Sequence, residues 1–203
     1  QKLWLTMLEP PEACRPVLEA LIRDNRVTAD DVWTRARRQF EANRTGNARN
    51  TLGALPASQT PDAKALDLVI SSPMGYLARQ PGNWNTTRAG RELAALAIQR
   101  IAANDPRSAA SELEKLQGRM QESERQWAWS QIGLQAARKH YPEAVAWFAQ
   151  AGSAPLSDEG YQWKVRAALR AHDWSMVLAT ISEMPPALAA QPEWIYWLAR
   201  AYK

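Results

Sequence analysis

Apolar residues recur at helical spacing in three successive stretches of the C-terminal part of the chain. The first stretch begins after Ser157, a residue type favoured at helix N-caps, and continues to Arg170. The second extends over residues 174–181, and the third begins at Pro192. Prolines follow the second stretch and open the third, as expected where one helix stops and another starts. The pattern predicts three amphipathic helices joined by short turns.

The order of helix, tight turn and second helix continues toward the N-terminus. Turn-forming residues mark a series of positions spaced by roughly 26 to 36 residues, the period of stacked helical hairpins. These positions are Glu9-Pro10-Pro11, Thr45-Gly46-Asn47, Ser72-Pro73, Asp105-Pro106, Tyr141-Pro142 and Asp173-Trp174. His140 and His172 fall at equivalent turns of two hairpins, which favours a structural role for both side chains.

The residue types point to one fold class. Ala, Leu, Arg, Gln and Glu dominate, whereas Val, Ile and Thr are sparse and alternating runs are absent. We therefore predict an all-α protein, in which residues 1–203 form a single domain of helical hairpins stacked into a curved superhelix, an α-solenoid. The first residues already follow the pattern without a cap, and the last helix meets no stop signal. We expect both ends to be cut from a longer chain.

Charge and aromatic content leave two interpretations of the surface open. The net charge of +4 permits an anionic polymer as partner but does not require one, and we predict neither a nucleic-acid partner nor a membrane span. The ten tryptophans could form an aromatic surface for sugars or bases, or they could fill the packing between hairpins. On the helix that follows Thr28, Arg35 and Arg38 belong to a basic face with the aromatic Trp33 nearby, which a phosphate- or carboxylate-binding surface could have, and these three are candidate glycan-facing residues. An ordinary solvated helix face is the alternative.

Motifs for catalysis or metal binding are absent from the sequence. There is no Walker loop, no His-Glu-x-x-His and no Gly-x-Ser-x-Gly, and one cysteine with two histidines cannot build a closed zinc site. Paired acids such as Asp30 and Asp31 fall in predicted first turns, where the helix dipole explains them. We predict no catalytic residue, metal or cofactor within the chain. Cys14 is either a small buried residue or half of a disulfide with an upstream cysteine.

Three groups of short motifs, ordered along the chain, carry a resemblance to a known family. They are Leu3-Trp4-Leu5-Thr6 with Pro11-x-Ala13-Cys14, then Ala42-x-x-Thr45-Gly46-Asn47 before Leu55-Pro56, and finally Met184-Pro185 with Glu193-Trp194-x-Tyr196-Trp197-x-Ala199. In order and spacing they resemble the N-terminal superhelical, U-shaped domain of the soluble lytic murein transglycosylases. The resemblance covers essentially the whole chain.

One stretch also resembles the family's catalytic motif. Gln121-Glu122-Ser123 precedes Ser130-x-x-Gly133-Leu134-Gln135, whereas the family's catalytic Glu lies in Gln-Glu-Ser ahead of Ser-x-x-Gly and Gly-Leu-Met-Gln. The Gly-Leu-Met-Gln segment and the motifs that line the family's cleft are missing here. We therefore interpret Glu122 as a surface residue of a scaffold helix.

The resemblance implies a non-catalytic scaffold segment of a periplasmic enzyme, a lyase that cleaves MurNAc–GlcNAc bonds of peptidoglycan to 1,6-anhydro-MurNAc ends. Its partners would be peptidoglycan and the enzyme's own C-terminal catalytic domain, and the segment alone should be inactive. The periplasmic setting and the family likeness favour the disulfide for Cys14. The alternative is a stand-alone adaptor of tetratricopeptide type that binds proteins in its concave face.

Overall fold

The computed structural model of this chain describes residues 16–17, 20–21, 24 and 26–203. Throughout these residues the regular structure is helical and contains no strand, which confirms the all-α prediction. The α-helices are α3 (Ala29–Glu41), α4 (Thr45–Leu52), α5 (Ala63–Ser71), α6 (Pro73–Arg79), α7 (Arg88–Asn104), α8 (Pro106–Leu116), α9 (Glu122–Arg138), α10 (Ala144–Gln150), α11 (Asp158–Arg170), α12 (Trp174–Glu183), α13 (Pro186–Ala189) and α14 (Pro192–Ala201). Two short 3₁₀ helices, η2 (Trp84–Thr86) and η3 (Gln117–Arg119), join them.

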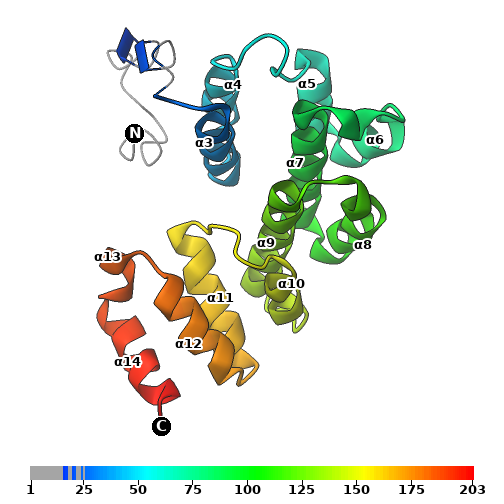
Figure 1. Cartoon of the computed structure of the whole chain (residues 1–203). Coiled ribbons are helices and arrows are strands. Elements are labelled where there is room, and N and C mark those ends of the chain that lie inside the picture. Colours follow the sequence, from blue (N-terminus) through cyan, green and yellow to red (C-terminus); the bar gives the residue numbers. More distant parts are fainter. Residues whose placement is uncertain (1–15, 18–19, 22–23, 25) are drawn as a thin grey trace.

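Successive helices pack as hairpins, and the hairpins stack along an arc. The pairs are α3 with α4, α5 with α6, α7 with α8, α9 with α10, and α11 with α12, and α14 then packs on α12. Figure 1 shows the arc passing from α3 and α4 through α7 and α9 to α11–α14, so that α3 and α11 lie on its inner side. This arrangement confirms the predicted curved stack of helical hairpins.

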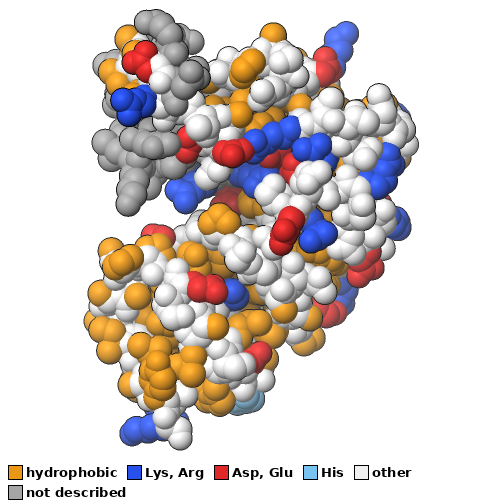
Figure 2. Space-filling model, viewed as in Figure 1, with side chains coloured by type: hydrophobic (Ala, Val, Ile, Leu, Met, Phe, Trp, Pro, Cys, Tyr) orange, Lys and Arg blue, Asp and Glu red, His pale blue; other side chains and the backbone are white. Residues whose placement is uncertain are grey.

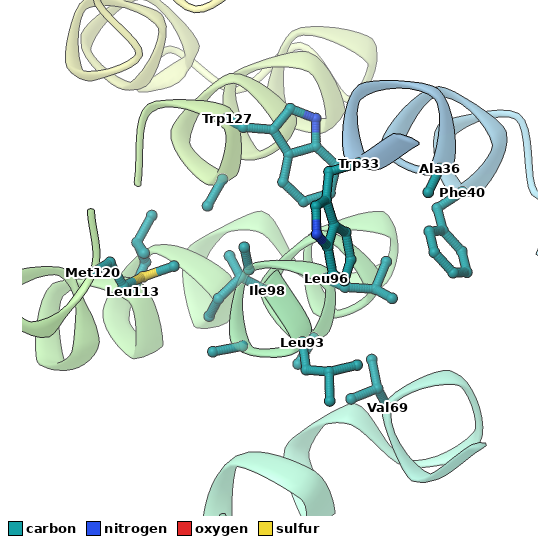
Figure 3. Close-up of a cluster of buried hydrophobic side chains, with 14 of the residues drawn as sticks. Trp33, Ala36, Phe40, Val69, Leu93, Leu96, Ile98, Leu113, Met120 and Trp127 are labelled. Carbon is teal, nitrogen blue, oxygen red and sulfur yellow. The ribbon is translucent and has the colours of Figure 1, made fainter. Parts of the chain in front are cut away.

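The centre of the stack is formed by α7 and α9, which pack against each other and against the neighbouring hairpins. Figure 3 shows Leu96 of α7 beside Trp33 of α3 and Trp127 of α9, within one buried cluster. Buried tryptophans are 2–5% exposed and are distributed along the chain: Trp33, Trp84, Trp127, Trp129 and Trp194. Of the two interpretations of the tryptophan content, packing between helices therefore accounts for these five indoles.

Local hydrogen bonds explain where several helices start. The Thr28 hydroxyl accepts from the Asp31 N–H at 3.2 Å, and the Asp31 carboxylate accepts from the Thr28 N–H at 2.9 Å, a reciprocal capping box. Ser157 caps α11, as predicted, by accepting from the Gly160 N–H at 3.2 Å. Asp173 caps α12 in the same way.

Three helices, α3, α9 and α11, are each followed by a residue in the left-handed conformation. These residues are Asn43, His140 and His172, with φ of 57°, 61° and 56°. After each of these residues, the next N–H reaches back five positions, for example from Tyr141 to the carbonyl of Ala136 at 2.9 Å. This is the Schellman motif, in which a left-handed residue allows backbone N–H groups after the helix to donate hydrogen bonds to carbonyls of the last turn. Both histidines thus occupy one structural position, in agreement with the structural role expected for them.

One predicted turn is wrong. Thr45, Gly46 and Asn47 form the first turn of α4, and the chain reverses before them, at Ala42–Arg44. The physical reason is that Asn43, whose side chain tolerates the left-handed region, already closes α3. The turn predicted at Glu9-Pro10-Pro11 lies outside the described residues.

Candidate functional site

A pocket of about 320 Å³ lies on the inner side of the arc, where α3 faces the first turns of α7 and α9 and the loop before α11. Its lining residues are Asp30, Thr34, Arg37, Arg38, Glu41, Arg88, Ser123, Gln126, Trp127, Ala154, Pro155 and Ser157. Figure 2 shows Lys or Arg side chains beside Asp or Glu side chains at the hollow between the α3 region and the lobe of α11–α14. The pocket is therefore lined by charged groups of both signs beside apolar side chains such as Trp127 and Pro155.

The floor of the pocket rests on a buried ion-pair network between α3 and α7. The Arg37 guanidinium donates two parallel hydrogen bonds of 2.8 Å to the Glu92 carboxylate, whose side chain is only 1% exposed. Arg88 pairs with Asp30 and lies 3.5 Å from the same Glu92 carboxylate. Such bidentate pairs fix the orientation of both side chains. Burial raises the pKa of Glu92, while the charges of Arg37 and Arg88 oppose that rise.

Trp127 forms one wall, and two polar contacts fix its indole ring. The Arg37 guanidinium lies 5.0 Å from the ring centroid, within the range of a cation–π contact. The indole N–H donates to the Glu41 carboxylate at 3.0 Å, and Gln131 donates to the same oxygen at 2.6 Å. Glu41 therefore ties α3 to α9.

The Glu41 carboxylate has an unusual environment for a residue at a pocket wall. Burial raises its pKa, and the opposing influences are the hydrogen bonds from Trp127, Gln131 and Ser157 and the charge of Arg38. Since three donors and one cation surround it, the carboxylate is held in place as a hydrogen-bond acceptor. Glu41 is also one of the two carboxylate residues that line the pocket, the other being Asp30.

A second buried pair orients the first turns of α7 and α9. Arg91 donates to Glu124 at 3.1 Å and to the backbone carbonyl of Asn85 at 3.0 Å. The Glu124 side chain is 2% exposed, so Glu124 is almost as buried as Glu92, and its partner Arg91 is 15% exposed. Together the two networks join α3, α7 and α9 next to the pocket.

The structure corrects the placement of two of the predicted glycan-facing residues. Trp33 and Arg35 are 4% and 1% exposed, so both lie inside the packed structure and not on an accessible face. The reason is that a helix inside a stack has neighbours on more than one side. Arg38 is half-buried and lines the pocket, so it alone of the three remains a candidate. Cys14 lies outside the described residues.

The stretch that resembles the family's catalytic motif forms α9. Glu122 is exposed in the first turn of this helix and accepts a hydrogen bond from Gln126 at 2.8 Å. The buried Ser130 hydroxyl donates to the backbone carbonyl of Trp127 at 2.7 Å. Gly133 lies so near Phe148 of α10 that an added Cβ would be 2.9 Å from the ring. Helix packing thus accounts for Ser130 and Gly133.

Sequence reasoning missed Arg88, Glu92 and Trp127 as residues of the site. Arg37 and Glu92 are 55 positions apart, and Trp127 is 86 positions from Glu41, so no local spacing connects them. In the sequence, the signal for Arg88 and Glu92 was the placement of charged residues within the otherwise apolar pattern of the long helix α7. Across the described part of the chain, no cluster of His, Cys, Asp and Glu could hold a metal ion, and no helix has the length and apolar character of a membrane span.

The architecture and the site define a class, a curved stack of helical hairpins with a charged pocket on its inner side. No family model matches this chain, and no curated protein matches it significantly. Among solved structures, it is similar to an inactive mutant of the lytic transglycosylase Slt from Pseudomonas aeruginosa, with 25% sequence identity and a TM-score of 0.60. The match covers 99% of this chain and 33% of Slt, so the chain spans about a third of that enzyme's length. This similarity supports the resemblance to lytic transglycosylases.

Proposed function

We propose that residues 1–203 form a non-catalytic, superhelical scaffold segment of a periplasmic peptidoglycan lytic transglycosylase. The observation that carries the proposal is the match to the lytic transglycosylase Slt over 99% of this chain, at 25% identity, together with the agreement in fold. The family motifs of the sequence give independent support, because they occur in the same order along the chain.

The parent enzyme in this proposal cleaves MurNAc–GlcNAc bonds and leaves 1,6-anhydro-MurNAc ends. Its catalytic domain would lie C-terminal to this segment, which contributes curvature and a polar inner surface that keeps peptidoglycan near the active site. Partners are then peptidoglycan and the catalytic domain itself. In an oxidising periplasm we also expect Cys14 to be bridged to an upstream cysteine, and peptide mapping of the oxidised complete protein would identify that pair.

The proposal is tested by product analysis. The 203-residue chain and the complete protein encoded by its gene are incubated separately with purified sacculi, and soluble products are examined by mass spectrometry for anhydro ends. We expect these products from the complete protein only. Release by the chain alone, abolished by Glu122→Gln, would make α9 catalytic, and an inactive complete protein would contradict the assignment to this enzyme class.

A protein-binding adaptor is the second candidate function, favoured by the apolar surface of α14. Ile195, Tyr196 and Tyr202 are 55%, 56% and 76% exposed, and exposed aromatic residues are common in binding surfaces. In the scaffold proposal, the same residues would be covered by the following part of the enzyme. The two candidates therefore differ in what lies after Lys203.

A further inference from the structure

We propose that the pocket between α3, α9 and the loop before α11 binds the zwitterionic end of an amino acid, a group with a carboxylate and an ammonium close together. The recognition itself rests on the geometry of the pocket. Only the source of the ligand rests on the proposed function, since the peptide stems of peptidoglycan can carry a diamino acid whose side-chain end has both groups free.

Size favours a single residue over a glycan strand. The pocket volume of about 320 Å³ lies at the lower end of the range for small-molecule sites, which is about 300–1,000 Å³. One amino-acid side chain fits such a volume, whereas a glycan strand would need an open groove of several sugar subsites. The pocket therefore suits the tip of a stem peptide better than the polysaccharide backbone.

The aromatic wall of the pocket also favours a stem peptide over a glycan strand. Sugar sites commonly offer the open face of an aromatic ring, but Trp127 is only 5% exposed and the Arg37 guanidinium lies 5.0 Å from its ring centroid. The ring is therefore not available as a stacking platform. What Trp127 offers, together with Ala154 and Pro155, is an apolar border against which methylene groups can pack.

The charges of the wall favour a ligand with both signs. Arg88 is paired with Asp30, and the charge of Arg38 acts on Glu41. A simple anion would have to take a guanidinium away from its carboxylate and leave that carboxylate uncompensated, which costs free energy. A zwitterion avoids this cost, because its carboxylate can face the arginines while its ammonium faces the acids.

These pairs assign the roles within the pocket. Arg38 and Arg88 present guanidinium donors that match a carboxylate, and hydrogen bonds to charged partners are the strong ones. Asp30 and Glu41 are the two carboxylate residues that line the pocket, so in this proposal the ammonium lies on their side. The Asp30 side chain is 82% exposed, so the ammonium enters where the pocket opens to solvent.

Calorimetric titration of the 203-residue chain tests the proposal with four probes. They are a muropeptide whose meso-diaminopimelate end is free, the same muropeptide amidated at that carboxylate, the same muropeptide acetylated at that amine, and a peptide-free glycan. We expect the free muropeptide to bind, either modification to weaken binding at least about tenfold, and the glycan not to compete.

Matched variants locate the binding. Arg38→Ala should weaken binding of the free muropeptide about tenfold or more, Arg38→Lys should restore part of the loss, and Asp30→Asn should weaken it while removing the discrimination against the acetylated probe. The control is Arg200→Ala, an exposed arginine on α14, which should bind as the unchanged chain does. Far-UV circular dichroism of each variant checks that the helices are retained.

The outcomes separate this inference from the proposed function. Equal binding of the free, amidated and acetylated probes, or equal effects of Arg38→Ala and Arg200→Ala, would overturn the pocket assignment even if the complete protein cleaves sacculi. Selective binding of the free zwitterionic end would support the pocket, and it would do so even if the complete protein released no anhydro products.

Discussion

Gly133 lies in the middle of α9, where this helix packs against α10 without a side chain between the backbone and the Phe148 ring. A Cβ at this position would be 2.9 Å from two ring atoms, whereas nonbonded carbons prefer about 3.5–4.0 Å. Phe148 is 1% exposed and cannot move away into solvent. Gly133→Ala is therefore an overpacking substitution, although the residue is in a helix.

Two effects of opposite sign decide the outcome of Gly133→Ala. Alanine gains about 1 kcal/mol of helix propensity over glycine, and overpacking of a filled core costs about 1–3 kcal/mol. The balance predicts a net destabilisation of about 1 kcal/mol. The control is Gly46→Ala, in the first turn of α4, where no neighbour lies within 4 Å of the added Cβ. We expect that variant to be about 0.5 kcal/mol more stable than the unchanged chain.

Urea unfolding followed by circular dichroism measures both variants. A double-mutant cycle adds the decisive comparison, because Phe148→Leu makes room for the methyl group and should reduce the cost of Gly133→Ala by at least about 0.5 kcal/mol. The reasoning fails if Gly133→Ala stabilises the chain as much as Gly46→Ala does, or if the two substitutions are additive.

Three other substitutions test local features by thermal or urea unfolding. His172→Gly should stabilise the chain by about 0.5–1 kcal/mol, because the exposed His172 holds a left-handed conformation that glycine adopts without strain. Asp173→Ala should cost about 1 kcal/mol at pH 7 through loss of the cap on the Met176 N–H. Hydrogen bonds from Ser175 and the Met176 N–H lower the pKa of Asp173, so this cost should be present above about pH 3.9 and disappear as the pH falls through the lower folded pKa. Glu92→Gln should destabilise the chain by about 2 kcal/mol. This cost is smaller than for a fully buried pair, because the side chain of Arg37 is 16% exposed and can turn toward water. An unchanged urea midpoint would contradict a structural role for the pair of Arg37 and Glu92.

Local signals allowed much of the fold to be predicted from the sequence. Ser157 caps a helix through a hydrogen bond to a residue three positions away, and Pro73 opens α6 after a turn at Ser72, so short windows contain the needed information. The turn at Asn43 was misplaced because Thr45-Gly46-Asn47 has turn-forming residue types, although the left-handed residue precedes them. Composition cannot distinguish these two positions.

The pocket could not be predicted in the same way, because its contacts join segments far apart in the chain. Arg35 and Arg38 belong to one predicted basic face of α3, yet packing buries Arg35 and leaves Arg38 at the pocket. Which side of a helix is covered depends on the neighbours that the stack supplies. The ion pair of Glu92 could not be predicted from local spacing either, since its partner Arg37 is 55 positions away.

The most direct test of the scaffold assignment is to determine the reading frame of the gene beyond Lys203. We predict that the frame continues into a domain with a Glu-Ser motif and a Gly-Leu-Met-Gln segment, the catalytic signature of the soluble lytic transglycosylases. In that case the exposed residues of α14, Ile195 and Tyr196, would pack against the following part of the protein. A stop codon directly after a single polar capping helix would contradict the scaffold assignment and favour a stand-alone adaptor.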